Sequence, residues 1–378
     1  MGSPIYFPIL RAKAGEIEAI GRLSPDAHSL TRPMLDFPTQ KAADRRSLEH
    51  YFEEKIHEIV KSWGTADEIY LDFSRYEPDI LLPNGWHIVD YVFHIARQRR
   101  LKPVPVIAPL SLRGPGKQYF EAVSRVTTHD RRGLALRVPY EDFKSQMNLE
   151  RTFKEIGSLI STVPQEMDIY LDTGALSVVR EEARDEAALA EKLRVAAKAA
   201  LDLGVRRVVF AASNVPDSMT PHNKGEVLRV SRVEFRTWRS LIRDSKYAFL
   251  MFGDYSVICP NQVESNRKVI PPSRVRVSTE DEYVLYKAGR DEIRSLSRSA
   301  VDEGALSGSV DSWGVRAVRE CAGGYGNQGR PTDWVARDTN MHIENTVAAM
   351  RRHVRTGLPQ SAVVASPWLQ DSLVFSDK

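Results

Sequence analysis

The chain has 378 residues, and its 53 lysines and arginines nearly balance 50 aspartates and glutamates, giving a formal net charge of +3. This balance excludes a uniformly basic surface for nucleic acid, so any basic region must be local. Two cysteines, Cys259 and Cys321, are too few for a disulfide framework or a CxxC zinc module. With no signal-peptide pattern and no apolar run of about 18 residues, the sequence predicts a cytoplasmic protein without a membrane segment.

Short apolar runs rich in β-branched and aromatic residues alternate along the chain with longer segments of helical periodicity. This alternation is typical of a parallel sheet covered by helices. Eight runs are predicted as strands, at residues 6–11, 33–37, 69–73, 104–109, 134–138, 169–173, 207–212 and 249–253. Helices are predicted between them, at residues 14–23, 46–63, 86–100, 116–126, 149–162, 184–203 and 224–244.

Eight alternating units predict an α/β fold, a (β/α)8 TIM-like barrel over residues 1–256. An open doubly wound sheet usually has fewer strands and carries a glycine fingerprint after its first strand, and none follows Arg11. Residues 257–378 are predicted to form an appended C-terminal α+β region that packs on the barrel. It is expected to contain a hairpin at 275–277 and 283–286, a glycine-rich loop, and helices near 288–304, 311–321 and 341–355.

Charged side chains are predicted to gather at the carboxyl ends of the strands, where barrel enzymes assemble their sites from the following loops. Alternate residues of a strand share a face, so placing Ile69 and Leu71 on the helix side sends Tyr70 and Asp72 inward. The same reasoning brings further polar residues to this end of the barrel. They are Arg11, Lys13, Asp36, Arg113, Arg137, Asp172, Ser213, Asp254 and Tyr255.

Such a ring of opposite charges has three interpretations, which the sequence leaves open. Unpaired buried ions cost several kcal/mol each, so these groups must pair, bind a metal or hold a charged ligand. The first interpretation is a structural ion-pair network, for instance Arg137 with Asp172, and the second is a pocket for a small anionic or zwitterionic ligand. The third is a divalent cation, Mg²⁺ or Mn²⁺, held by Asp72, Asp172 or Asp254. Zinc is not expected, because the histidines show no HxH or HExxH spacing.

Two glycine-rich segments do not match nucleotide-binding motifs. The segment Arg113–Lys117 follows a strand and opens a helix, but it lacks the GxxxxGK[ST] spacing. The GxGxxG of Gly324, Gly326 and Gly329 follows a helix and precedes Pro331, whereas a dinucleotide site requires it between a strand and a helix. The sequence also lacks a GxSxG elbow, and its basic clusters lack interleaved aromatic residues, so neither nucleophilic catalysis nor nucleic-acid binding is predicted.

Motifs spread over nearly the whole chain resemble those of one family. They are YFPILRAKAGE at Tyr6–Glu16, the pairs Leu71-Asp72 and Leu171-Asp172, Arg232 with Glu234 and Trp238, FGDY at Phe252–Tyr255, TEDEY at Thr279–Tyr283, SWG at Ser312–Gly314, and TNMH at Thr339–His342. The set is similar to the "beta protein" family of bacterial and phage-associated proteins, whose function is poorly characterised. Met341 stands where we expect a second histidine beside His342, which argues against a metal site there.

The resemblance implies an association with phages or other mobile elements, and a role in anti-phage defence, without naming a reaction. One hypothesis is an enzyme that acts on a phosphorylated or nucleotide-like small molecule. Its catalytic residues would be Asp72, Asp172 and Asp254, and its ligand would be bound by Arg11, Lys13, Asp36, Arg113, Arg137, Ser213 and Tyr255. The other hypothesis is a non-catalytic ligand sensor or protein-interaction scaffold, with a protein partner in a phage-related or defence system.

Overall fold

The computed structural model describes residues 3–40, 44–108, 116–160, 162–176, 185–216, 226–261, 273–289, 291–325 and 327–354. Its centre is a sheet of eight parallel strands in the order β1-β2-β3-β4-β5-β6-β7-β9. The strands are β1 (Ile9–Arg11), β2 (Met34–Asp36), β3 (Glu68–Asp72), β4 (Lys102–Ile107), β5 (Leu134–Pro139), β6 (Met167–Ala175), β7 (Arg207–Ser213) and β9 (Met251–Asp254). Each predicted run supplies one strand, so the predicted barrel is confirmed.

The barrel closes where the segment before β1 meets β9. Tyr6 forms a parallel bridge with Phe252, and the Phe7 N–H donates a hydrogen bond to the Phe252 carbonyl over 2.8 Å. Gly253 faces this seam, and a Cβ atom at that position would lie 2.3 Å from the Phe7 carbonyl oxygen. Glycine is therefore required here, because a side chain would separate the two closing segments.

Gly253→Ala is expected to lower the free energy of unfolding by about 1–3 kcal/mol, because the added methyl group must push the seam apart. Urea unfolding measures the effect. Gly308→Ala is the matched control, since a Cβ at Gly308 meets nothing within 4 Å. Equal stabilities of the two variants would contradict a tightly closed seam.

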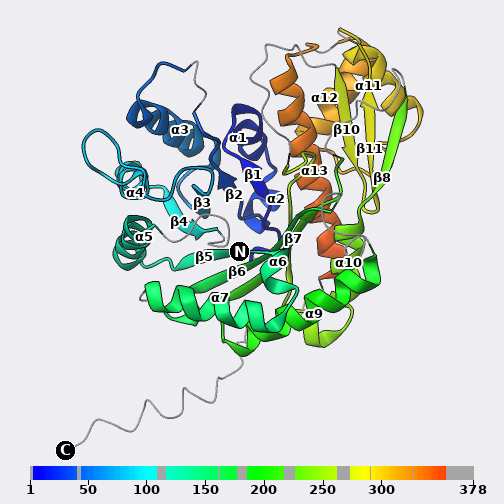
Figure 1. Cartoon of the computed structure of the whole chain (residues 1–378). Coiled ribbons are helices and arrows are strands. Elements are labelled where there is room, and N and C mark those ends of the chain that lie inside the picture. The colour runs from blue at the N-terminus through cyan, green and yellow to red at the C-terminus, as the bar shows by residue number, and fades with distance from the viewer. Residues whose placement is uncertain are drawn as a thin grey trace, which may run out of the picture.

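Helices follow the strands in alternation and cover the outside of the barrel (Figure 1). They are α1 (Ala14–Gly21), α2 (Pro25–Leu30), α3 (Leu48–Trp63), α4 (Ile88–Gln98), α5 (Lys117–Asp130), α6 (Tyr140–Phe143), α7 (Gln146–Leu159), α9 (Glu186–Asp202) and α10 (Val233–Ile242), with 3-10 turns at η2 (Pro164–Glu166) and η3 (Ser245–Tyr247). Of the helices described, none combines the length and the apolar composition that a membrane span requires.

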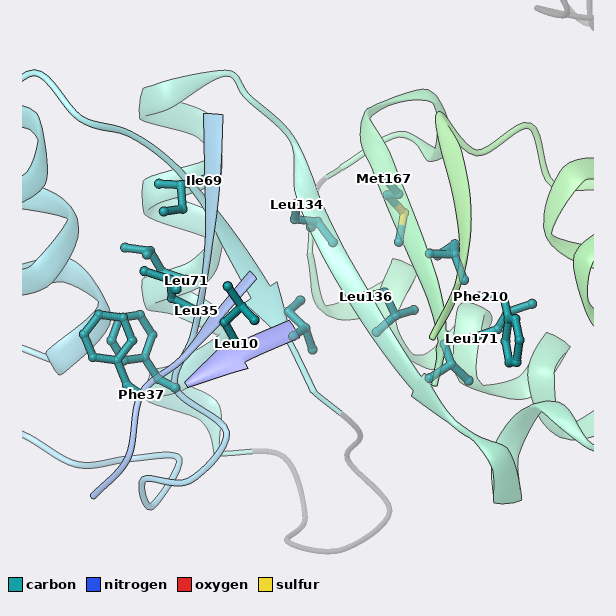
Figure 2. Packing of buried hydrophobic residues seen from close by; sticks show 14 of the residues in the cluster. Leu10, Leu35, Phe37, Ile69, Leu71, Leu134, Leu136, Met167, Leu171 and Phe210 are labelled. Atoms are coloured by element: carbon teal, nitrogen blue, oxygen red, sulfur yellow. The ribbon is translucent and has the colours of Figure 1, made fainter. Parts of the chain in front are cut away.

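The strands separate two apolar layers, as alternation of their side chains predicts. Outward-facing residues pack beneath the helices and include Leu10, Leu35, Ile69, Leu71 and Leu136 (Figure 2). Inward-facing residues fill the barrel interior and include Phe7, Met34, Tyr70, Ala135 and Tyr170. The interior is therefore a packed core, and a polar site can form only above it, at the ends of the strands.

A smaller unit follows the barrel and contains a three-stranded antiparallel sheet. Its strands, in order, are β10 (Arg274–Ser278), β11 (Glu282–Lys287) and β8 (Val227–Ser231). Its helices are α11 (Ile293–Asp302), α12 (Trp313–Gly323) and α13 (Pro331–His353). The long helix α13 runs between this sheet and the barrel, where it packs on α1 (Figure 1).

Two predicted helices are wrong in extent. Residues 227–231, predicted as part of a helix over 224–244, form β8, because pairing with β11 supplies their backbone hydrogen bonds. The last helix begins at Pro331 and not at 341, since proline is favoured in the first turn of a helix. Strand β8 precedes residue 256, yet it pairs with strands of the region predicted to begin at 257.

Candidate functional site

Arg137 is the centre of an ion-pair network at the carboxyl-terminal mouth of the barrel. It projects inward from β5, and its Nε donates to Asp172 Oδ2 at 2.6 Å while its Nη1 donates to Asp72 Oδ2 at 2.8 Å. The third nitrogen, Nη2, donates to the Tyr255 hydroxyl oxygen at 2.6 Å, and that hydroxyl donates to Asp172 Oδ2 at 2.6 Å. Residues from four different strand ends therefore meet, and we call these four residues the Arg137 network.

Backbone N–H groups just after β3 and at a register shift within β6 anchor the two carboxylates of this network. Asp72 Oδ1 accepts a hydrogen bond from the Ser74 N–H at 2.8 Å, and Asp172 Oδ1 accepts one from the Gly174 N–H at 2.8 Å. Each carboxylate oxygen of this pair thus has a partner. The ion pair expected between Arg137 and Asp172 is confirmed, and these groups satisfy one another without a ligand.

A second ion pair lies beside the network. Asp36 is the register neighbour of Asp72 across β2 and β3, and Arg75 Nε donates to both Asp36 carboxylate oxygens, at 2.7 and 2.8 Å. Burial raises the pKa of Asp72; Arg137 lowers it, and the Asp36 carboxylate raises it further. The mouth therefore holds adjacent carboxyl groups, and the pKa of Asp72 lies above its ordinary value.

A small cavity opens next to these ion pairs, between the end of β1, the start of α1 and the segment after β9. Its polar lining residues are Arg11, Glu16, Asp36, Arg75, Tyr255 and Ser256. The Arg11 side chain reaches the far side, where Nη2 donates to the Pro260 carbonyl at 3.1 Å. The enclosed space accommodates about one water molecule, so only a small group can enter it.

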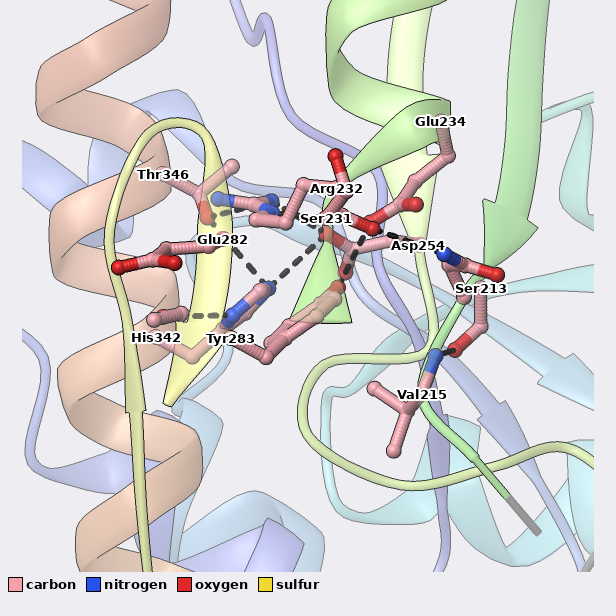
Figure 3. Close-up of polar contacts among 12 residues, drawn as sticks. Ser213, Val215, Ser231, Arg232, Glu234, Asp254, Glu282, Tyr283, His342 and Thr346 are labelled. Carbon is pink, nitrogen blue, oxygen red and sulfur yellow. Dashed lines mark hydrogen bonds and ion pairs between the residues drawn. The ribbon is translucent and has the colours of Figure 1, made fainter. Parts of the chain in front are cut away.

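Asp254 was predicted at the mouth, and this prediction is wrong. In β9, Phe252 packs with the outer core while Met251 contacts the inner core, so Asp254 points outward, towards the smaller unit. Its Oδ1 accepts a hydrogen bond from the Tyr6 hydroxyl at 2.5 Å. Its Oδ2 lies 3.1 Å from Arg232 Nη2 and 2.9 Å from His342 Nε2 (Figure 3).

These contacts belong to a fully buried set of polar residues at the joint between the barrel and the smaller unit. We call it the Asp254 cluster; it comprises Tyr6, Arg232, Glu234, Asp254, Ser278, Tyr283 and His342. The Tyr283 hydroxyl donates a hydrogen bond to Glu234 Oε1 at 2.8 Å (Figure 3). His342 Nδ1 lies 2.9 Å from Ser278 Oγ. Burial raises the pKa of Glu234 to about 7, against the lowering effect of Arg232.

In the Asp254 cluster, a histidine contacts a serine with one ring nitrogen and an aspartate with the other, as in a hydrolase triad. Ser278, His342 and Asp254 are each 0% exposed, however, so a substrate cannot reach the hydroxyl group. A nucleophile must contact its substrate to act. We therefore interpret the cluster as the structural connection between the barrel and α13.

The remaining predicted residues have simpler surroundings. Ser213 is buried at the end of β7, and its Oγ accepts a hydrogen bond from the Val215 N–H at 3.2 Å. Lys13 caps the N-terminus of α1, and Arg113 lies outside the described residues. Across the described ranges, no group of three or more Asp, Glu, His or Cys side chains could hold a metal ion, so the third interpretation, a bound Mg²⁺ or Mn²⁺, has no ligand set there.

The sequence model of the Beta protein family matches residues 6–348, nearly the whole chain. The chain belongs to the Beta protein family. No curated protein matches it. Among solved structures, a crystal structure of triosephosphate isomerase from Bartonella henselae covers 66% of this chain and 90% of its own, at 12% identity and a TM-score of 0.31. At so low a score, the barrel assignment rests on the strand order and not on this similarity.

The motifs that resemble the Beta protein family come together in space. Tyr6, Arg232, Asp254, Tyr283 and His342 come from five of those motifs and all belong to the Asp254 cluster. In this Beta protein, the most specific motifs thus build the joint between the two units. Their buried contacts explain the residue types without any catalytic role.

Sequence reasoning missed two residues of the mouth. Arg75 lies three positions after the end of β3, and its only signal was that it follows a strand whose last residue is charged. Glu16 lies in the first turn of α1, where acidic residues are favoured by the helix dipole and are usually exposed. Here Glu16 is buried, because it faces the cavity that the segment after β9 closes, on a helix that packs on α13.

Proposed function

We propose that this Beta protein binds a small anionic or zwitterionic ligand at the mouth of its barrel. The observation that carries the proposal is the cavity beside the Arg137 network, where Arg11 and Arg75 meet Glu16 and Asp36. These four residues come from β1, the loop after β3, α1 and β2. A guanidinium group is suited to bidentate contacts with a carboxylate or phosphate, and barrels place their ligand sites at this end.

The second candidate function is catalysis on a phosphorylated or nucleotide-like ligand by Asp72 and Asp172. The neighbouring Asp36 favours it, because it raises the pKa of Asp72 together with burial, and a carboxyl group with a raised pKa is suited to general acid–base chemistry. Both aspartates, however, have all their oxygens engaged with Arg137, Tyr255 or the backbone. Binding needs no rearrangement of that network, and for this reason we favour binding over catalysis.

The biological context follows from the resemblance alone. In the non-catalytic form of the proposal, ligand occupancy is sensed by a protein partner in a phage-related or anti-phage system in the cytoplasm. The family match itself names no partner and no such system. The segment after β9 contributes both to the mouth cavity and to the Asp254 cluster, so it offers a route from the ligand to the smaller unit.

The test is a thermal-shift series with inorganic phosphate, adenosine monophosphate and glycine. At least one probe is expected to raise the melting temperature, because a ligand that binds only the folded state stabilises it by mass action. Arg75→Gln should lose most of the shift. Arg125→Gln is the matched control, since Arg125 is 56% exposed and pairs with Asp90 away from the mouth. A wild-type protein that responds to none of the probes, or an Arg75→Gln variant that keeps the full shift, would contradict the proposal.

A further inference from the structure

A buried hydroxyl group that lines the mouth cavity has no hydrogen-bond partner among the described residues. It belongs to Ser256, which is 1% exposed. Glu16 lines the same cavity and is 3% exposed, and the positive charges that act on its carboxyl include Lys13 and Arg11. Buried polar groups are normally satisfied, so the Ser256 hydroxyl beside the Glu16 carboxyl indicates a place for ligand atoms.

The backbone at Ser256 supports the same interpretation. Its φ of 55° lies in the left-handed region, which serine rarely adopts. Its N–H donates to Asp254 Oδ1 at 2.9 Å, so the Asp254 cluster holds this conformation in place. Unusual backbone conformations that the surrounding structure enforces are concentrated at ligand sites.

Size and charge together narrow the group that this cavity can take. Space for about one water molecule is too small for a carboxylate or a phosphate, whereas an ammonium group has nearly the size of a water. Glu16, Asp36 and Ser256 offer oxygen acceptors to such a group. The Arg75 side chain is 37% exposed, so it reaches the solvent side, where the rest of a ligand would lie.

We propose that the cavity is an ammonium subsite, in which Glu16 and Ser256 bind the ammonium group of a zwitterion whose carboxylate or phosphate is bound by Arg75 and Arg11. The inference rests on the proposed function and deepens it by naming the ligand class. It assigns to Glu16 the role of selecting a zwitterion over a simple anion.

The protonation of Glu16 gives this subsite a characteristic pH dependence. Burial raises the pKa of Glu16 to about 7, against the lowering effects of its own backbone N–H, Lys13, Arg11 and Arg276. Asp36 and Arg75 also line the cavity, and Asp338 faces Arg276 from α13 at 3.1 Å. An ammonium group binds the ionised form, which grows from roughly a tenth of the molecules at pH 6 to roughly nine tenths at pH 8, so affinity should rise about tenfold.

The experiment compares ligand pairs that differ only by the ammonium group. Glycine is paired with acetate and phosphoethanolamine with ethyl phosphate, and affinities for the full chain are measured by calorimetry at pH 6 and pH 8. In at least one pair, the zwitterion should bind tenfold or more tightly at pH 8, and the ratio of the two affinities should fall about tenfold at pH 6. Which pair responds distinguishes a carboxylate from a phosphate as the anionic part.

Two variants test whether Glu16 causes the preference for the zwitterion over the simple anion. Glu16→Gln should abolish both the preference for the zwitterion and its pH dependence, while the anion still binds. Glu18→Gln is the matched control on the same helix, because the Glu18 side chain is 41% exposed and pairs with Arg22. If Glu16→Gln does not fold, the pH dependence of the wild-type ratio remains as a readout that needs no variant.

The outcomes separate the two proposals. Equal affinities for both members of each pair, a ratio that does not change with pH, or a preference retained by Glu16→Gln would overturn the ammonium subsite and leave the anion site standing. Failure of all four compounds to bind would overturn the ammonium subsite, and the anion site falls with it if inorganic phosphate and adenosine monophosphate also give no thermal shift.

Discussion

Asp254→Ala is expected to lower the free energy of unfolding by about 3–5 kcal/mol, the range for removing one partner of a buried ion pair. Arg232 is 0% exposed and would lose its closest counter-charge, with Glu234 remaining at 3.6 Å. The Tyr6 and His342 contacts to the carboxylate would be lost at the same time. Urea unfolding, followed by the fluorescence of the nearby buried tryptophan in α10, measures the loss.

The control for this prediction is Asp281→Ala. Asp281 also pairs with an arginine, Arg239, at 2.9 Å, but its side chain is 60% exposed, so the expected cost is about 0–1 kcal/mol. The double variant Asp254→Ala with Arg232→Met should recover part of the loss, because no buried charge is then left unpaired. A loss below about 1 kcal/mol in the single variant would mean that Arg232 does not depend on Asp254.

The barrel could be predicted because each of its strands is recognisable from the pattern of residues within that strand alone. Each strand alternates large apolar residues between two buried faces, and this alternation alone places Tyr70 and Tyr170 inside the barrel and Leu71 and Leu171 outside it. The prediction failed for the start of α10, where β8 is a strand only because β11 pairs with it. That pairing joins residues far apart in the chain, and no local pattern reveals it.

The site was predicted only in part, for a related reason. Asp72, Arg137 and Asp172 followed from strand alternation, which holds wherever both faces carry distinctive residues. Strand β9 gave no such cue, because Gly253 has no side chain, and Asp254 was placed on the wrong face. Asp254 points outward because it pairs there with Arg232 and His342. His342 lies in α13, far from Asp254 in the chain, so no local pattern indicates this contact.

The two clusters are linked through one short segment. Asp254 belongs to the joint, Tyr255 to the Arg137 network, and Ser256 to the mouth cavity. Strand β9 ends at Asp254, and the backbone then turns at Ser256, so three consecutive residues point in different directions and connect the C-terminal unit with the mouth of the barrel. A change at the joint should therefore alter the mouth, whereas changes on the far helices α4 and α5 should not.

Arg137→Met is expected to lower the free energy of unfolding by about 3–5 kcal/mol at pH 8, because two buried carboxylates would lose their shared counter-charge. The loss should shrink as the pH falls. Without the guanidinium, burial and Asp36 raise the pKa of Asp72 further, against the lowering effect of the Ser74 N–H. The folded state then binds more protons than the unfolded state, so stability increases below the folded pKa and decreases as the pH rises through it.

Urea unfolding at pH 5 and pH 8 measures the difference in free energy of unfolding between Arg137→Met and wild type, which should be smaller at pH 5. Arg125→Met is the control. Arg125 pairs with Asp90 at 2.6 Å but is 56% exposed, so its loss should cost about 0–1 kcal/mol at either pH. A stability difference between Arg137→Met and wild type that stays constant with pH would show that the released carboxylates keep their charge, as they would if Arg75 turned towards them. The mouth would then be adaptable, with guanidinium groups that exchange partners as an arriving anion would require.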